Sequence, residues 1–283
     1  MLASNSSGQS PRMSLLSAEL DGEQFRTISR FVHDVCGIYL KPGKEALVRS
    51  RLMKRLRVLG MQSFAQYMQF LESEKGAAEL SDMIDVLTTN KTSFFREMAH
   101  FDFLRTTLLP QLKKKRLRFW TAASSSGQEP YSLAIVLREF FPDIETRDVR
   151  ILATDISTRM LEKLHRGVYA AEDLQDLAPA LLNKHFHRVS PGSPAEFQIK
   201  DATRALVFPA RLNLIDPWPM KGPFEVIFCR NVMIYFDKPT QQRLIGRFWN
   251  LLAPGGYLFV GHAEGLSSIS HRFKYVQPAV YLK

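Results

Sequence analysis

The sequence predicts an α/β fold with a mostly parallel sheet and a small antiparallel β-subdomain inserted in it, preceded by an all-α N-terminal domain. Three observations predict this fold. Apolar residues recur at helical spacing over the first third of the chain, and short apolar runs alternate with helical segments after residue 116. A region with scattered Pro and Gly then interrupts that alternation. The 283 residues are ample for a substantial core, and no apolar run approaches the roughly 18–20 residues of a membrane span.

The N-terminal third predicts a tail followed by a helical bundle. Residues 1–17, rich in Ser, Asn, Gly and Gln, lack an apolar segment and predict a disordered tail rather than a secretory signal. A helical domain is expected over 18–88. Apolar residues at i, i+3, i+6, i+7 and i+10 from Phe25 onward mark its first helix, which Gly37 ends. Further helices are expected over 44–59, stopping at Gly60, over 64–74 and over 77–87.

The rest of the chain predicts the α/β domain, over residues 117–283, after a junction at 89–116. Four apolar runs are expected to form parallel strands, at 117–122, 149–154, 225–229 and 257–260. The runs 273–276 and 279–282, separated by Gln277-Pro278, predict a closing antiparallel pair. The β-subdomain is expected over about 185–212, with short runs at 197–199 and 206–208.

The loop after the first strand, residues 122–130 (AASSSGQEP), is the expected ligand site. In an open α/β sheet, ligands bind beyond the carboxyl ends of the strands. Small residues let a ligand approach the backbone, and the following helix N-terminus offers free N–H donors. The loop lacks G-x-G-x-x-G, which argues against a dinucleotide site. A tight strand–helix turn, with Glu129 favouring the helix dipole, explains the loop equally well.

Two further features bear on the ligand. Asp155 ends the second strand, where a carboxylate suits a ribose hydroxyl pair, although an N-cap role for the next helix is at least as compatible. Residues 251–260 (LLAPGGYLFV) give a helix end, a turn and a strand. That pattern and the closing antiparallel pair are frequent in S-adenosylmethionine-dependent methyltransferases. Together these features favour a methyltransferase over a dehydrogenase.

Three separated segments sharpen this interpretation: LTTNKTSFFRE at 87–97, SSGQEPYS at 125–132 and FCRNVMIYFDK at 228–238. They resemble the bacterial chemotaxis receptor methyltransferases, the CheR family, over nearly the whole chain after the tail. The resemblance implies a Rossmann-like methyltransferase sheet. It also implies methyl transfer from S-adenosylmethionine to glutamate side chains on a chemoreceptor's cytoplasmic helices. Ser126 and Gln128 stand where Thr and Glu are common in the family, and both keep small or polar character.

The resemblance also implies site residues. The expected cofactor contacts are Asn90, Thr92, Arg96, Glu129, Asp155, Asn213, Leu214, Arg230 and Asn231. Arg96 and Tyr235 are expected near the reacting centre. A carboxylate is already ionised at neutral pH, so alignment matters more than a general base. Arg96 can orient a carboxylate through two hydrogen bonds, and Tyr235 can donate one or line the methyl channel. The alternatives are that Arg96 holds only the cofactor carboxylate and that Tyr235 is a packing residue.

The charge distribution points to an acidic partner. The chain has 38 Lys and Arg against 28 Asp and Glu, a net charge of +10. Seven basic residues and one acidic residue lie in 41–59, opposite an apolar face. The resemblance places receptor binding here, and the expected contacts are Arg49, Arg51, Lys54, Arg55 and Arg57. The alternative is a solvated face. Residues 113–116 (KKKR) are expected to be a solvated linker.

No metal ion is expected, because the chain has only two cysteines and its histidines lack metal-ligand spacing. Scarce cysteine favours a reducing compartment, and we expect a cytoplasmic monomer without direct membrane insertion. Whether a receptor's C-terminal peptide docks on the β-subdomain, near residues 190–194, stays open.

Two rival functions fit part of the sequence. A nucleic-acid methyltransferase would also use a basic patch, but the Asn/Asp-Pro-Pro-aromatic motif is absent and Cys229 lacks a preceding Pro. A sensor that binds the cofactor without transferring methyl is disfavoured by the retained Arg96, Asp155, Arg230 and Tyr235. Nucleic acid is therefore not expected as a partner.

Overall fold

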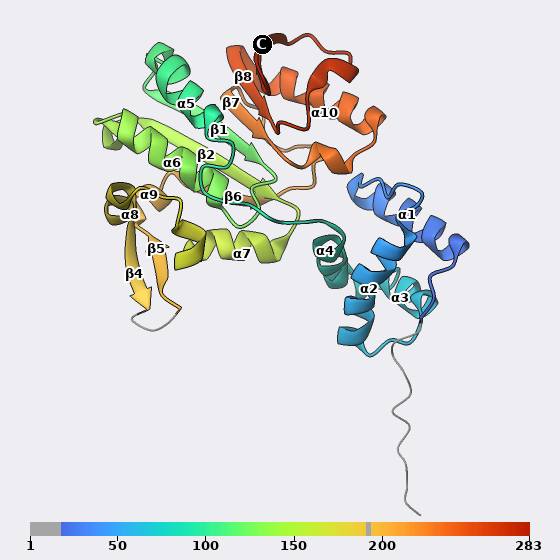
Figure 1. Ribbon diagram of the computed structural model, residues 1–283. Coiled ribbons are helices and arrows are strands. Elements are labelled where there is room, and N and C mark those ends of the chain that lie inside the picture. The colour runs from blue at the N-terminus through green and yellow to red at the C-terminus, as the bar shows by residue number, and fades with distance from the viewer. Residues whose placement is uncertain (1–17, 191–193) are drawn as a thin grey trace, which may run out of the picture. The chain divides into compact units, whose positions relative to one another are not determined.

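The computed structural model describes residues 18–190 and 194–283, which form two compact units (Figure 1). The expected tail at 1–17 and residues 191–193 lie outside the described residues. The helical unit contains the described residues up to Arg30 together with Lys41–Leu87, and the α/β unit contains Phe31–Leu40 and Thr88–Lys283. The last part of the first helix therefore belongs to the α/β unit, although the sequence assigned all of 18–88 to the helical domain.

Among the described residues, the helical unit contains the first part of α1 (Gly22–Cys36) and three further helices. These are α2 (Glu45–Leu59), α3 (Phe64–Leu71) and α4 (Gly76–Leu87). Gly60 ends α2 as predicted, because its left-handed backbone (φ 66°) lets its N–H reach the Arg57 carbonyl. The Ser63 side chain caps α3 by accepting from the Gln66 N–H. α3 is shorter than the predicted 64–74. Its packing core includes the fully buried side chains of Leu52 and Tyr67.

The α/β unit has a seven-stranded sheet in the order β6-β2-β1-β7-β8-β10-β9. The strands are β1 (Arg116–Ala122), β2 (Asp148–Asp155), β6 (Val207–Arg211), β7 (Phe224–Cys229), β8 (Leu252–Val260), β9 (Lys274–Gln277) and β10 (Val280–Leu282). The first five in the sheet are parallel, and β10 and β9 join antiparallel. The predicted α/β fold, with its closing antiparallel pair, is therefore confirmed.

The sheet is packed on its faces by helices and held by aromatic side chains. The helices of this unit are α5 (Ala99–Phe103), α6 (Gln128–Phe140), α7 (Thr158–Arg166), α8 (Pro179–His185), α9 (Asp201–Arg204) and α10 (Lys238–Leu251). Both α6 and α7 contact β2 and β6, and α10 contacts β8. Between neighbouring strands, the Phe228 and Phe259 rings stack with centroids 4.5 Å apart. The described residues contain no helix both long and apolar enough to cross a membrane.

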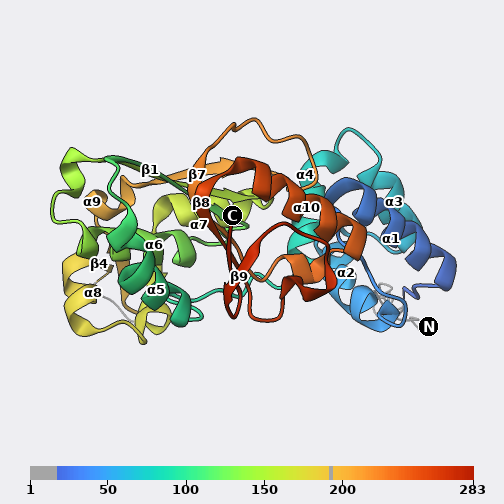
Figure 2. The same ribbon diagram turned by 90° about the horizontal axis from the view of Figure 1, so that it is seen from above.

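The small antiparallel sheet differs from the predicted β-subdomain at 185–212. It contains β3 (Val168–Ala170), β5 (Glu196–Ile199) and β4 (Phe186–Ser190), in the order β3-β5-β4. β4 lies beside α8 in both views (Figures 1 and 2). The predicted run at 206–208 instead starts β6, where Val207 is in register with Ile151 of the large sheet. A short apolar run indicates a strand but does not identify its partner, and the three-residue β3 is too short to show alternation.

Candidate active site

The loop between β1 and α6 is tied to the end of β2. The Ser124 N–H donates to the Thr154 carbonyl (2.8 Å) and the Ser125 N–H donates to Asp155 Oδ2 (2.8 Å). Gly127 precedes α6 and has φ 99°, and a Cβ there would lie 2.8 Å from side-chain atoms of Leu164 and Tyr169. Only glycine therefore fits this turn, which brings the backbone of the loop to the carboxyl edge of the sheet.

Asp155 is held by two backbone donors at the end of β2. Its Oδ2 accepts from Ser125 and its Oδ1 accepts from the Ser157 N–H (2.9 Å). The N-cap of α7 is Ser157, whose hydroxyl accepts from the Met160 N–H (3.2 Å). Asp155 is therefore not the cap that the sequence offered as its alternative role. Its partly buried carboxylate is fixed in orientation at the sheet edge.

Arg230, directly after β7, is the centre of a buried charge cluster. Its side chain is 1% exposed, with the two terminal nitrogens 3.1 Å from Glu129 Oε2 and 3.3 Å from Glu97 Oε2. It also donates to the backbone carbonyl of Arg96, and its Nε has no hydrogen-bond partner among the described residues. Burial raises the pKa of Glu129 to about 7. Burial opposes ionisation of Glu97 too, but Arg230, the hydrogen bond from Asn231 and the two nearby histidines together hold the Glu97 pKa below its ordinary value.

Residues 88–97 cross the carboxyl edge of the same sheet. The Asn90 carbonyl accepts from Ser125 Oγ (3.2 Å), and the Phe95 N–H donates to Ser132 Oγ on α6 (2.9 Å). The Thr89 N–H donates to the Tyr235 hydroxyl (3.0 Å). This segment therefore connects the β1 loop, α6 and the region after β7, which are far apart in the sequence.

Glu264 supports the backbone after β7 and β8, and the sequence reasoning missed it. Its side chain accepts from the N–H groups of Asn231 (2.6 Å), Gly261 (2.7 Å) and Ile234 (3.1 Å). Burial raises its pKa. Its position soon after the buried Val260, at a strand's carboxyl end, was the available sequence signal.

Comparison with known proteins identifies the family. The family described as "CheR methyltransferase, SAM binding domain" matches residues 90–282, and "CheR methyltransferase, all-alpha domain" matches residues 23–88. The chain belongs to the CheR methyltransferase family. It is 43% identical over 241 residues to a "Probable chemotaxis protein methyltransferase" of Rhizobium etli, covering 83% of this chain and 90% of that protein. It is 39% identical over 263 residues to the "Chemotaxis protein methyltransferase" of Escherichia coli, covering 93% and 91%.

The CheR fold brings most of the expected site residues to one edge of the sheet. Arg230 contacts Glu129 and the Arg96 backbone directly, and Asn231 contacts Glu97. The Tyr235 hydroxyl bonds the backbone of Thr89, next to Asn90. The Arg96 side chain is exposed and donates to the Lys91 carbonyl (2.9 Å). Three of the residues expected to bind the cofactor, Thr92, Asn213 and Leu214, take no part in the hydrogen bonds and ion pairs just described.

Asn213 and Leu214 follow β6, and Thr92 is partly buried in the segment at 88–97. The Asn213 amide donates to the Val35 carbonyl (2.7 Å), while the Leu214 carbonyl accepts from Arg247 (2.8 Å). These two groups are engaged within the protein. They border the site next to Asp155, whose carbonyl accepts from the Leu212 N–H (3.0 Å).

The donor set of this CheR site fits S-adenosylmethionine. An oriented carboxylate at the end of β2, Asp155, is the group that binds ribose hydroxyls in α/β sheets. The methionyl end carries an ammonium and a carboxylate, which Glu129 and Arg230 complement in charge. Two buried polar atoms at this edge, Ser124 Oγ and Arg230 Nε, have no hydrogen-bond partner among the described residues. Unpaired buried polar atoms are costly, and their presence favours a polar ligand here.

The basic residues of α2 have unequal surroundings in the helical unit. Lys54 and Arg57 are exposed. Arg49 donates to the Ala18 carbonyl (2.9 Å), and Arg51 donates to the Leu87 carbonyl. Arg55 binds Glu79 through two nitrogens (2.8 and 2.6 Å) and also Asp82 (2.7 Å). The sequence grouped Arg55 with the surface charges, and the structure instead places its guanidinium in an internal ion-pair network.

Proposed function

We propose that this CheR family member transfers the methyl group of S-adenosylmethionine to glutamate side-chain carboxylates of chemoreceptors, forming methyl esters. Family membership carries the coarser statement, a CheR methyltransferase with a SAM binding domain. The observation that supports a working site is the convergence of Asp155, the Glu129–Arg230 pair and residues 88–97 at the carboxyl edge of one sheet. We also propose a cytoplasmic, monomeric protein, as the sequence predicts.

Asp155, Glu129 and Arg230 hold the cofactor in this proposal. Asp155 accepts hydrogen bonds from the ribose, and the Glu129–Arg230 pair binds the zwitterionic methionyl end. Glu97 holds Arg230 from the other side, and its own Oε1 accepts from Asn231 Nδ2 (3.4 Å). When bound, S-adenosylmethionine supplies an electrophilic methyl group on its sulfonium. The protein therefore needs to orient the nucleophile and exclude water from it.

Arg96 and Tyr235 position the substrate carboxylate in this proposal. The Arg96 guanidinium is exposed and attached to backbone that Arg230 fixes, so it can bind a carboxylate arriving from solvent. The Tyr235 hydroxyl is held by the Thr89 N–H and lies 3.4 Å from the Thr89 carbonyl, to which it can donate. A carboxylate is already a nucleophile at neutral pH, so neither residue has to remove a proton.

The exposed face of α2 is the proposed receptor surface. Lys54 and Arg57 lie on it with two exposed apolar residues, Leu47 (47% exposed) and Val58 (70%). Positive charge around apolar contacts suits a helical bundle that carries glutamates. The docking of a receptor C-terminal peptide near residues 190–194 stays open, and residues 191–193 of that loop lie outside the described residues.

The decisive experiment is methyl transfer from radiolabelled S-adenosylmethionine to receptor-containing membranes. We expect label on the receptor that mild base releases, since methyl esters hydrolyse readily. Label found only on RNA or DNA would contradict the proposal and favour a nucleic-acid methyltransferase. Cofactor binding without transfer to any of these substrates would also contradict it and favour a sensor.

Reversing the two exposed charges separates receptor binding from cofactor binding. We expect the double variant Lys54→Glu/Arg57→Glu to lower kcat/KM for receptor methylation by about 10-fold or more, roughly 1.4 kcal/mol. The dissociation constant for S-adenosylhomocysteine should not change. The matched control is Lys113→Glu/Lys115→Glu, which makes the same charge change on exposed residues of the α/β unit. Equal losses in both double variants would show a general charge effect and refute the surface.

A further inference from the structure

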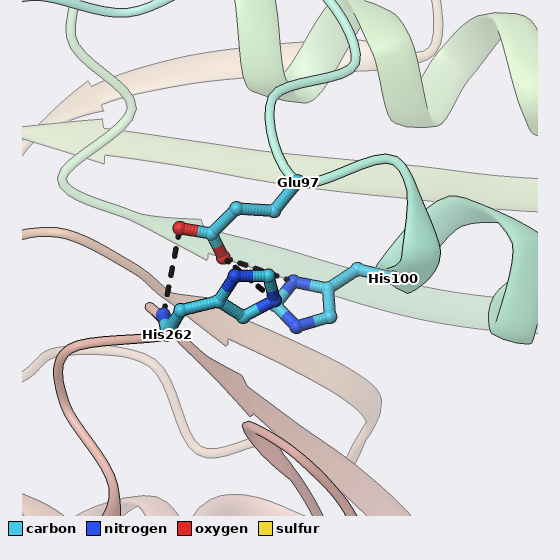
Figure 3. Close-up of side chains that lie close together, drawn as sticks. All are labelled: Glu97, His100 and His262. Atoms are coloured by element: carbon cyan, nitrogen blue, oxygen red, sulfur yellow. Dashed lines mark hydrogen bonds and ion pairs between the residues drawn. The ribbon is translucent and has the colours of Figure 1, made fainter.

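Glu97, His100 and His262 bring three potential metal ligands together (Figure 3). Glu97 Oε2 lies 3.5 Å from His100 Nδ1 and 3.9 Å from His262 Nε2. Each residue contributes one ligand atom, and all these atoms lie within 4.8 Å of one another. His100 is on α5 and His262 follows β8, so the fold joins residues that no local spacing in the sequence connects.

His100 is the buried member of this cluster. It is fully buried (0% exposed), its Nδ1 faces Glu97 Oε2, and its ring also approaches the backbone of Pro278. In Figure 3 the ring lies with Nδ1 next to the Glu97 carboxylate. A neutral imidazole next to a carboxylate is a common metal-ligand pair.

The Glu97–His100 separation matches the coordination of zinc, and His262 lies farther out. Zn–N and Zn–O bonds of about 2.0–2.1 Å at a tetrahedral ion place neighbouring ligand atoms about 3.3 Å apart. The Glu97–His100 separation of 3.5 Å is within a few tenths of this value. His262 is 54% exposed, so its ring has room to turn from 3.9 Å to bonding position and to admit the ion from solvent.

The surroundings orient Glu97. Glu97 Oε1 accepts from Asn231 Nδ2 and from the backbone N–H of His262 (both 3.4 Å). This leaves Oε2 beside the ring nitrogens of His100 and His262. Arg230 also faces Oε2 at 3.3 Å and opposes a second cation. Arg230 is shared with Glu129 at 3.1 Å, so it does not act on Glu97 alone.

We propose that Glu97, His100 and His262 form a binding site for one divalent transition-metal ion, with zinc the best match. Two imidazoles and a carboxylate are the donor set of three-ligand zinc sites, which leave a fourth position for water. The sequence predicted no metal, because spacing along the chain does not reveal ligands that only the fold brings together. The proposal does not depend on methyl transfer, and its test does not measure that activity.

The test is a calorimetric titration of the metal-free, untagged full chain with Zn²⁺. We expect one ion per chain, and a tetrahedral absorption spectrum when Co²⁺ replaces Zn²⁺. His262→Gln should weaken binding by roughly 10- to 100-fold or more, because losing a ligand costs at least as much as losing an outer-shell partner. The exposed position of His262 makes this variant safe for folding, which circular dichroism checks.

His187→Gln is the matched control, since His187 is an exposed histidine on β4 outside the cluster. It should bind zinc like the unaltered protein. The absence of saturable binding at one ion per chain would overturn the proposal. So would unchanged affinity in His262→Gln, or an equal loss of affinity in His187→Gln.

Discussion

Replacing Arg55 by Met should destabilise the helical unit without acting through any partner. The Arg55 guanidinium makes three hydrogen bonds, two to Glu79 and one to Asp82. The Glu79 side chain is only 4% exposed, and its other contact is the Tyr67 hydroxyl at 2.8 Å. Without Arg55, an ionised carboxylate would stay buried with one neutral donor.

The expected loss in the free energy of unfolding follows from how exposed the side chains of the ion pairs are. Removing one partner of a buried ion pair costs about 3–5 kcal/mol. Arg55 is 15% exposed and Asp82 is 40% exposed, so solvent replaces part of the lost interaction. We therefore expect the low end, about 3 kcal/mol. This is a large fraction of the stability of a small domain.

The assay is urea unfolding followed by two signals. All three tryptophans, Trp120, Trp218 and Trp249, lie in the α/β unit, so their fluorescence follows that unit. Far-ultraviolet circular dichroism also reports α1 to α4. We expect Arg55→Met to move an early part of the dichroism transition to lower urea and leave the fluorescence transition in place.

Two further variants decide the interpretation. Adding Glu79→Leu to Arg55→Met should recover part of the loss, because no unpaired carboxylate then stays buried. The exposed Arg57 supplies the control, and Arg57→Met should cost less than about 0.5 kcal/mol. If Arg55→Met were no more destabilising than Arg57→Met, the internal role of Arg55 would be refuted.

Two other predictions concern the α/β unit. Asp155→Asn should weaken S-adenosylhomocysteine binding by about 10-fold or more in calorimetry, because ribose loses a charged acceptor worth about 1.5–3 kcal/mol; an unchanged constant would rule out that role. The pKa of Glu129, about 7, lies above its ordinary value of 4.5, so ionisation favours unfolding. This contribution to stability is present below pH 4.5 and is lost as pH rises to about 7. In the unaltered protein, the urea midpoint of the tryptophan fluorescence transition should therefore fall as pH rises through this range, and Glu129→Gln should reduce that fall. An equal fall in the variant and the unaltered protein would contradict the prediction.

Much of the fold could be predicted because local patterns encode it. The apolar stripe from Phe25 predicts α1, and Gly60 ends α2 where its left-handed conformation is needed. The apolar runs of the central strands are buried on both faces, as parallel strands are. The pairing of the strands was harder to predict than their positions. The run at 206–208 joined the large sheet because β6 pairs with β2, a choice made by tertiary packing alone.

The charge cluster was only half predictable. Glu129 and Arg230 lie in segments that resemble the CheR family, so their positions could be inferred. Glu97 and Glu264 bind Arg230 and the Asn231 backbone, respectively, across more than 30 residues of sequence. Nothing in periodicity or spacing reveals such a contact. It becomes visible only once the strand order brings the segments together.

Backbone strain shows why this edge of the sheet is a site rather than a set of loops. Five non-glycine residues with positive φ lie in the three segments that converge here: Phe95, Glu97, Ala123, Ser125 and Asn231. Each such conformation costs about 1 kcal/mol or more for a side-chain-bearing residue. Hydrogen bonds hold several of them, including those from Phe95 to Ser132 and from Asn231 to Glu264. Strain kept in place by such bonds costs stability, so its concentration beside Arg230 indicates a geometry retained to orient ligands before they bind.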